Sequence, residues 1–153
     1  MTENIDHIDR RLLRTLQEDA ALRVEDLAER VGLSRNACWR RVKRMEEAGI
    51  LRDRVWRADP AKIGCPLEVV ALIRTTTHDD AWRDAFRRTV AAMPEVVGAY
   101  RMTGDLDYML RIRVADVAAY DAVYKRLTSA IALSDISASF VMEEIKETTA
   151  LPV

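Results

Sequence analysis

Two clusters in this chain have residue types and spacing that suit chemistry, and the first runs from Gly32 to Glu46. Cys38, Val42 and Met45 recur there at i, i+4 and i+7, which predicts a helix with one buried face. The opposite face of this helix carries long hydrogen-bond donors and an aromatic ring, which are side chains that reach phosphates and base edges of DNA. They are Arg35, Asn36, Trp39, Arg40 and Lys43. The pattern favours a DNA recognition helix over an arginine-rich surface helix.

The second cluster is the sequence Thr103-Gly104-Asp105-Leu106-Asp107-Tyr108, which lies between two predicted strands. A flexible glycine, free backbone amides and two nearby carboxylates suit a small zwitterion, because carboxylates bind its ammonium group and amides bind its carboxylate. A plain hairpin turn would have the same composition. Paired aspartates also serve in Mg²⁺ binding or acid–base catalysis, but this turn has no third acidic ligand, nucleophile or histidine beside it. The sequence therefore does not favour an enzyme.

The charge distribution supports the first cluster. The whole chain has a net charge of −1, which by itself indicates nothing about nucleic acid. Between residues 35 and 57, however, eight basic residues stand against three acidic ones. This local excess is the electrostatic footprint expected of a DNA-binding surface.

Cysteine and histidine usage limits the other classes of function. Cys38 and Cys65 form no CxxC pair, and no long apolar run opens the chain, so we expect a reduced cytoplasmic protein without a membrane span. His7 and His78 have no partner at ligand spacing, so we expect neither a metal nor a cofactor. Cys38 could serve as a redox sensor, but its place on the buried face favours a small core residue.

Three short helices precede a predicted strand in the first part of the chain. Apolar residues from Ile5 to Leu16 predict the first helix, with Asp6 as its cap, and residues 27–31 predict a second without a good cap at Arg23. The third helix begins after Ser34 and ends at Gly49, and the alternation over residues 50–56 predicts a strand. This order indicates a winged helix-turn-helix domain over residues 1–58, followed by a linker over residues 59–66.

The period of the hydrophobic pattern changes after the linker. Residues 67–75, 96–102, 108–114 and 136–144 predict strands, while 79–93 and 116–130 predict helices. The order βαββαβ indicates a ferredoxin-like domain over residues 67–153, so the fold class is α+β. The sheet face away from the helices stays partly apolar, which predicts a homodimer. The apolar residues on that face are Val70, Leu72, Met109 and Val141.

These features together resemble the Lrp/AsnC, or feast/famine, family of transcription regulators over nearly the whole chain. The most specific segments are 8–13, 31–34, 38–42, 104–108 and 142–146. The resemblance implies homodimers that assemble into tetramers or octamers and bind amino acids between dimers. Carried onto this sequence, it implies effector contacts from the glycine–aspartate turn and from the last strand nearby. These residues are Met102, Thr103, Gly104, Asp105, Asp107, Ser139, Phe140 and Met142.

A narrower set of segments is similar to a subgroup of cysteine-responsive activators of cysteine desulfidase genes. It includes Cys38-Trp39, Trp82 and residues 93–96, 120–121, 124–127 and 148–153. The likeness implies L-cysteine or another sulfur amino acid as effector. Two departures are Arg23, where Ser or Thr is usual, and Ala132, where relatives carry a Pro-Gly turn.

The expected function is thus effector-dependent, sequence-specific binding to double-stranded DNA with two-fold symmetric half-sites. An architectural protein that wraps DNA with little sequence preference is the alternative, and the ratio of specific to random binding separates the two. The residues expected to contact bases or phosphates are Ser34, Arg35, Asn36, Trp39, Arg40, Lys43, Arg44 and Arg54.

Overall fold

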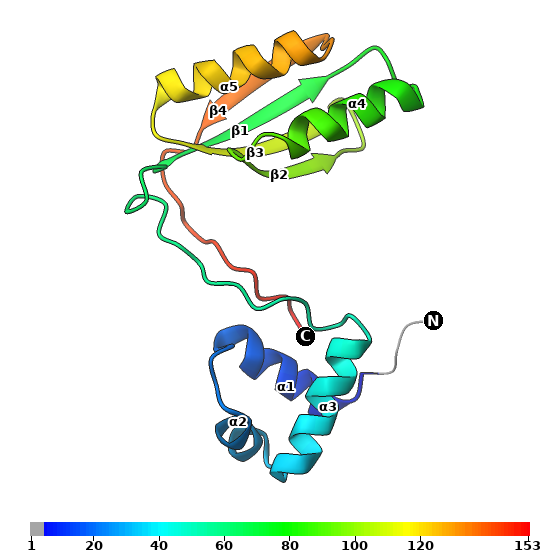
Figure 1. Ribbon diagram of the computed structural model, residues 1–153, viewed down its shortest axis with the longest axis vertical. Helices are drawn as coiled ribbons and strands as arrows, with labels where there is room; N and C mark the ends of the chain where they lie inside the picture. Colours follow the sequence, from blue (N-terminus) through cyan, green and yellow to red (C-terminus); the bar gives the residue numbers. More distant parts are fainter. Residues whose placement is uncertain (1–4) are drawn as a thin grey trace. The chain divides into compact units, whose positions relative to one another are not determined.

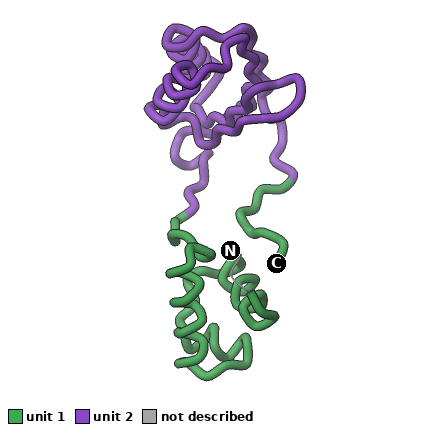
Figure 2. The backbone as a smooth tube through the Cα atoms, turned by 90° about the vertical axis from the view of Figure 1, so that its right-hand side faces the viewer, with its two compact units in different colours: residues 1–56, 146–153 green, residues 57–145 purple. Residues whose placement is uncertain are grey.

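The computed structural model describes residues 5–153, so the first four residues of the predicted DNA-binding domain lie outside the described part. The chain divides into two compact units (Figure 2). The first contains the chain up to Trp56 together with Lys146–Val153, and the second contains Arg57–Ile145. The last segment therefore packs with the first unit, whereas the sequence assigned all of residues 67–153 to the second. Main-chain hydrogen bonds of Leu151 and Val153 to side chains of the first helix, together with the Val153 side chain packed against the core, attach this segment to the first unit.

The first unit consists of α1 (His7–Glu18), α2 (Val24–Val31) and α3 (Arg35–Glu47). Asp6 caps α1 by accepting hydrogen bonds from the amides of Ile8 and Asp9 at 2.9 and 2.8 Å, and the Asp9 carboxylate accepts from the Asp6 amide. As predicted, α2 has no side-chain cap, and Arg23 instead pairs with Asp26 at 3.0 Å.

Helix α3 has the predicted entry and buried face. The Ser34 hydroxyl accepts from the Ala37 amide at 3.3 Å, and Gly32 ends α2 with φ of 68°, a left-handed conformation that glycine adopts without steric cost. The core of the unit joins the apolar sides of all three helices. Leu12, Cys38 and Met45 are fully buried in it, and Leu27 and Val42 are nearly so.

The strand predicted over residues 50–56 is absent. Residues 52–59 carry no regular structure, and the side chains of Val55 and Trp56 are 78% and 97% exposed. A strand is stabilised by hydrogen bonds to a neighbouring strand, and the described residues supply none beside this segment. Alternation of apolar and charged residues alone was therefore insufficient to predict a strand in this segment.

The second unit has the predicted βαββαβ order: β1 (Leu67–Arg74), α4 (Asp80–Ala91), β2 (Val96–Arg101), β3 (Tyr108–Val114), α5 (Val117–Ala130) and β4 (Asp135–Phe140). The antiparallel sheet has the strand order β2-β3-β1-β4, and both helices cover one face of it (Figure 1). Asp79 and Asp116 cap the two helices by accepting from the amides of Trp82 and Ala119. The ferredoxin-like fold is confirmed.

Alternate residues of the central strands build the core of the second unit. Val69, Ala71 and Ile73 of β1 face the helices together with alternate residues of β3, and all are buried. An aromatic cluster packs between α4 and β3, with ring centroids of Phe86 and Tyr108 4.4 Å apart. This core fixes the ends of β1, β2 and β3, from which the glycine–aspartate turn projects.

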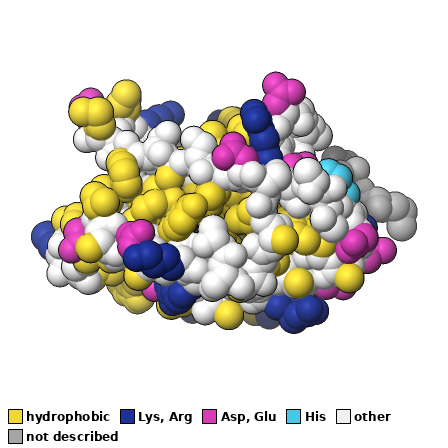
Figure 3. Space-filling view, turned by 90° about the horizontal axis from the view of Figure 1, so that it is seen from above, with side chains coloured by type: hydrophobic (Ala, Val, Ile, Leu, Met, Phe, Trp, Pro, Cys, Tyr) yellow, Lys and Arg dark blue, Asp and Glu magenta, His cyan; other side chains and the backbone are white. Residues whose placement is uncertain are grey.

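The other face of the sheet combines apolar and charged residues. Val70, Leu72 and Met109 are only partly buried there. Glu68 is buried on the same face and forms ion pairs with Arg111, at 2.8 Å, and with Arg113. Figure 3 shows a different view, from above, in which hydrophobic side chains occupy the middle and many charged side chains lie toward the margin. Among the described residues, no helix is both long and apolar enough to cross a membrane.

Leu110 provides a test of the core of the second unit. It is fully buried at the centre of β3, so Leu110→Ala should destabilise this unit by about 2–5 kcal/mol through lost burial and a cavity. Val97→Ala, at an exposed position of β2, should change stability by less than about 0.5 kcal/mol. Thermal unfolding followed by circular dichroism measures both. Equal stability of the two variants would contradict the packing described for β3.

Candidate nucleic-acid interface and effector site

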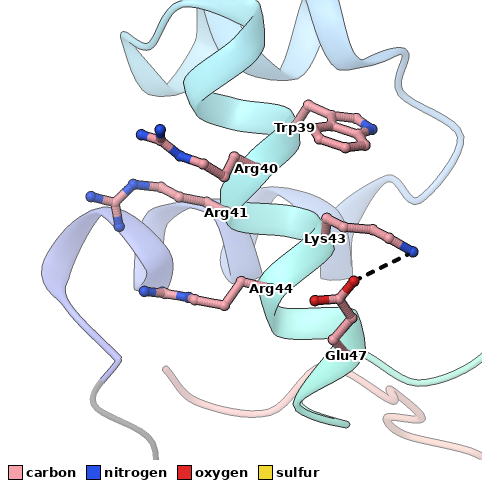
Figure 4. Close-up of a pocket in the computed structure, with 6 residues that line it drawn as sticks. All are labelled: Trp39, Arg40, Arg41, Lys43, Arg44 and Glu47. Atoms are coloured by element: carbon pink, nitrogen blue, oxygen red, sulfur yellow. Dashed lines mark ion pairs between the residues drawn. The ribbon is translucent and has the colours of Figure 1, made fainter.

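A groove of about 370 Å³ lies along the exposed side of α3. Arg40, Arg41 and Arg44 project from one side of the helix in Figure 4, and Trp39, Lys43 and Glu47 from the other. Five of these six side chains are cationic or aromatic. Such a surface attracts the phosphate backbone and offers donors to base edges.

Two of the arginines are held from within the unit. The guanidinium of Arg41 donates to the carboxylates of Asp6 and Asp9 at 2.7 and 2.8 Å, and Arg44 donates to Asp9 at 2.5 Å. Asp9 is fully buried, so its charge is compensated by these two cations and by the capping contact with Asp6. This network joins the beginning of α1 to the middle of α3.

The remaining cations differ in how closely they pair with acidic side chains. Lys43 lies 3.9 Å from Glu47, and Arg54 lies 3.9 Å from Glu46, distances at the limit of an ion pair. Arg35 pairs with Glu25 of α2 at 2.7 Å, with both side chains largely exposed. Arg40 is exposed and forms no ion pair or hydrogen bond with any residue that the structure describes. Its donors are thus available to a ligand.

The other predicted DNA contacts lie at the start of α3. Asn36 is exposed on the first turn, and Trp39 is 56% exposed on the next. The Ser34 hydroxyl oxygen is engaged in the cap, but its proton remains available as a donor. Arg44 differs from the expectation most clearly, since Asp9 already holds its guanidinium.

Sequence reasoning missed Arg41 and Asp9 as parts of this surface. Both lie beside apolar stripe residues, where a helical pattern shows only that they are near the core. The pairing of Asp9 with Arg41 spans 32 residues of sequence. The capping-box position of Asp9 was the available signal, but it explains only the contact with Asp6.

The glycine–aspartate turn closes the β2–β3 hairpin. The Met102 amide donates to the Asp107 carbonyl at 2.8 Å, and Gly104 has φ of 100°, which disfavours any residue with a side chain. The Asp107 carboxylate accepts from the Thr75 amide at 2.8 Å. Asp107 therefore anchors the turn to the end of β1.

Asp105 is placed differently from Asp107. Its carbonyl oxygen accepts from Arg74 Nε at 3.1 Å, and its carboxylate has no partner among the residues described here. Thr103, Gly104 and Asp105 are exposed. The turn thus presents a free carboxylate beside exposed backbone on a fixed support.

Ser139, Phe140 and Met142 do not lie near this turn within one chain. In the sheet, Val69 pairs with Phe140, whereas Ile73 at the other end of β1 pairs with Tyr108 next to the turn. Four residues of strand separate the two ends by roughly 13 Å. Phe140 packs edge-on against Tyr120 of α5, and Met142 is fully exposed. A single site with both groups requires a second copy of the chain.

Cys38 has the environment of a core residue. Burial raises the pKa of its thiol, which disfavours the reactive thiolate. Cys65 is partly exposed in the segment before β1, and it is also a free thiol.

The comparisons with known proteins cover both units. The chain matches the Lrp/AsnC ligand binding domain over residues 68–151 and a winged helix-turn-helix DNA-binding domain over residues 5–52. The chain belongs to the Lrp/AsnC family. It is thus a sequence-specific DNA-binding transcription regulator with an amino-acid ligand-binding domain, and not an enzyme.

Individual known regulators match this chain over nearly their full length. The DNA-binding transcriptional activator DecR of Escherichia coli K12 is 47% identical over 97% of this chain and 99% of its own. The glutamate uptake regulatory protein of Zymomonas mobilis is 43% identical over 100% of this chain and 93% of its own. An AsnC family regulator from Agrobacterium tumefaciens is 51% identical, covers 96% of both chains and has a TM-score of 0.93. A regulator of Neisseria meningitidis, solved as an L-Met complex, is 35% identical over 97% of both chains with a TM-score of 0.92.

The Asp6 carboxylate provides a pH test of the network behind α3. The Asp9 amide and then Arg41 lower its pKa from 3.8 to about 2. The ionised form therefore stabilises the folded unit above pH 3.8, and this stabilisation is lost as the pH falls toward 2. The melting temperature of Asp6→Asn should be lower than that of the wild type at pH 6, and the gap should narrow between pH 4 and pH 2. A gap that stays constant over this range would contradict the assigned pKa.

Proposed function

We propose that the chain acts as a homodimer, assembled further into tetramers or octamers, on an operator with two-fold symmetric half-sites. Each α3 enters the major groove, with Asn36 and Arg40 at base edges. The observation that carries this proposal is the groove on α3, where the exposed Arg40 has no partner among the described residues. The partly apolar sheet face with Val70, Leu72 and Met109 supports pairing with a second copy.

The remaining contacts take separate roles in this proposal. Ser34, Lys43 and Arg54 bind phosphates, and Trp39 lies against the sugar–phosphate backbone. Arg35 and Arg44 reach DNA only by exchanging their carboxylate partners, Glu25 and Asp9, for a base edge or a phosphate. Their contributions are therefore smaller than that of Arg40.

We infer that the effector is L-cysteine or a related sulfur amino acid, bound at the glycine–aspartate turn. The Asp105 carboxylate suits an ammonium group, and exposed amides of residues 103–105 suit a carboxylate. The L-Met complex of the Neisseria regulator supports a sulfur amino acid. The resemblance of segments such as Cys38-Trp39 to cysteine-responsive activators points the same way. The glutamate uptake regulatory protein is nearly as similar to this chain as DecR is, and its name supports an effector with an acidic side chain. The test therefore includes L-glutamate.

Completion of this site by a second copy explains the separation found in one chain. Ser139 and Met142 of one copy would face the turn residues Met102, Thr103 and Asp105 of another, with Phe140 behind them. An effector held between copies favours one assembly over another, and the spacing of the recognition helices changes with it.

Arg40→Ala tests the DNA contact. Loss of a base-reading guanidinium should weaken operator binding by about 1–3 kcal/mol and relax specificity at one position. Arg88→Ala, on the exposed surface of α4, removes the same charge and should leave affinity within twofold. Fluorescence anisotropy at fixed salt measures both. Equal effects of the two variants would show that only net charge matters, as in an architectural protein.

Asp105→Ala and Asp107→Ala test the effector site. Asp105→Ala should reduce the effect of millimolar L-cysteine on operator affinity at least tenfold without lowering thermal stability, because Asp105 makes no structural contact through its carboxylate. Asp107→Ala should lower stability by about 1–3 kcal/mol as well, since the Thr75 amide loses its acceptor. An unchanged response of Asp105→Ala to both L-cysteine and L-glutamate would remove Asp105 from the site.

A further inference from the structure

The chain connects its two units twice. It leaves the first unit after Trp56 and returns to it at Lys146, at the end of the segment that continues β4 (Figure 2). The returning residues 146–153 pack with the DNA-binding unit. A second attachment restricts the motion of two units more than a single linker does.

The returning segment is bound through its main chain. The Leu151 amide donates to Gln17 Oε1 at 2.6 Å, and Gln17 Nε2 donates back to the Leu151 carbonyl at 3.2 Å. Arg14 Nε donates to the Val153 carbonyl at 2.5 Å. The Val153 side chain packs against the core of the unit, while that of Leu151 is 70% exposed. The contact therefore depends on the backbone of the segment and on one apolar side chain, that of Val153.

Helix α1 brings this contact and the DNA interface onto one rigid element. Arg14 and Gln17 lie three residues apart and thus on one side of the last turns of α1. Asp9, at its other end, holds Arg41 and Arg44 of α3. A force on the returning segment therefore acts on the helix that positions α3.

We propose that the surface of α1 formed by Arg14 and Gln17 is a docking site for residues 151–153 of the chain itself, and that this attachment sets the orientation of the recognition helix for paired half-sites. The inference rests on the proposed two-fold operator. Three hydrogen bonds at exposed positions are individually weak, so the attachment opens without unfolding the unit. When the attachment is open, the linker alone connects α3 to the second unit. Assembly of the second unit can therefore change DNA binding by favouring the attached or the open form.

Amide hydrogen exchange in the full chain tests the attachment directly. Gln17→Ala removes the acceptor of the Leu151 amide and should accelerate its exchange about tenfold. Glu18→Ala, on the adjacent exposed position of α1, should leave the exchange rate as in the wild type. A Leu151 amide that exchanges equally fast in the wild type and Gln17→Ala would overturn the docking site.

Binding to duplexes with one or two half-sites tests the orienting role. The wild type should prefer half-sites one helical turn apart over half-sites shifted by half a turn. Gln17→Ala should reduce this preference about fivefold and keep affinity for a single half-site within twofold. Leu151→Pro lacks the amide donor and lies outside α1, so it should have the same effect even where a change in the helix harms folding.

Each remaining result of the half-site experiment would contradict one named part of the proposal. An unchanged spacing preference in both variants would overturn the orienting role, and equal losses on one and two half-sites would reduce the segment to a stabiliser of the unit. A wild type without any spacing preference would overturn the symmetric operator and the orienting role with it, while the exchange of Leu151 would still decide the docking site.

Discussion

The buried carboxylate of Asp9 is the constraint on which the DNA-binding unit depends. A charge without exposure to water is costly unless it is paired, and here Arg41 and Arg44 of α3 supply the compensating charges. These arginines cannot leave Asp9 together without exposing an unpaired charge to the core, so α3 stays fixed against α1. The same pairing divides the basic groove into cations that hold the helix and an exposed Arg40 that is available to DNA.

A similar division of work occurs in the glycine–aspartate turn. Asp107 holds the turn to β1 through the Thr75 amide, and Asp105 is left exposed. In both places one acidic residue organises the backbone or the partner helix, and a neighbouring charged group stays free for a ligand. The organising groups make the exposed ones precise, since a contact group on a rigid support loses little entropy on binding.

The sequence predicted what depends on local pattern. The caps by Asp6 and Ser34, the buried stripe of α3 and the βαββαβ order follow from hydrogen-bonding residues and hydrophobic period, and the structure confirms them. The missing strand at residues 50–56 shows the limit, because a strand depends on a partner that alternation does not specify. The pairing of Asp9 with Arg41 and the return of residues 146–153 to α1 are long-range contacts of polar groups, which leave no period in the sequence.

The central claim is that an amino acid bound by the second unit changes the DNA occupancy of the first. Anisotropy of the full chain on the intergenic DNA upstream of its own gene and on a scrambled duplex, each with and without millimolar L-cysteine, tests it most directly. The account predicts selective binding to the intergenic duplex that shifts with the amino acid. Equal affinity for the two duplexes, unaffected by L-cysteine or by any other amino acid of a panel, would contradict it.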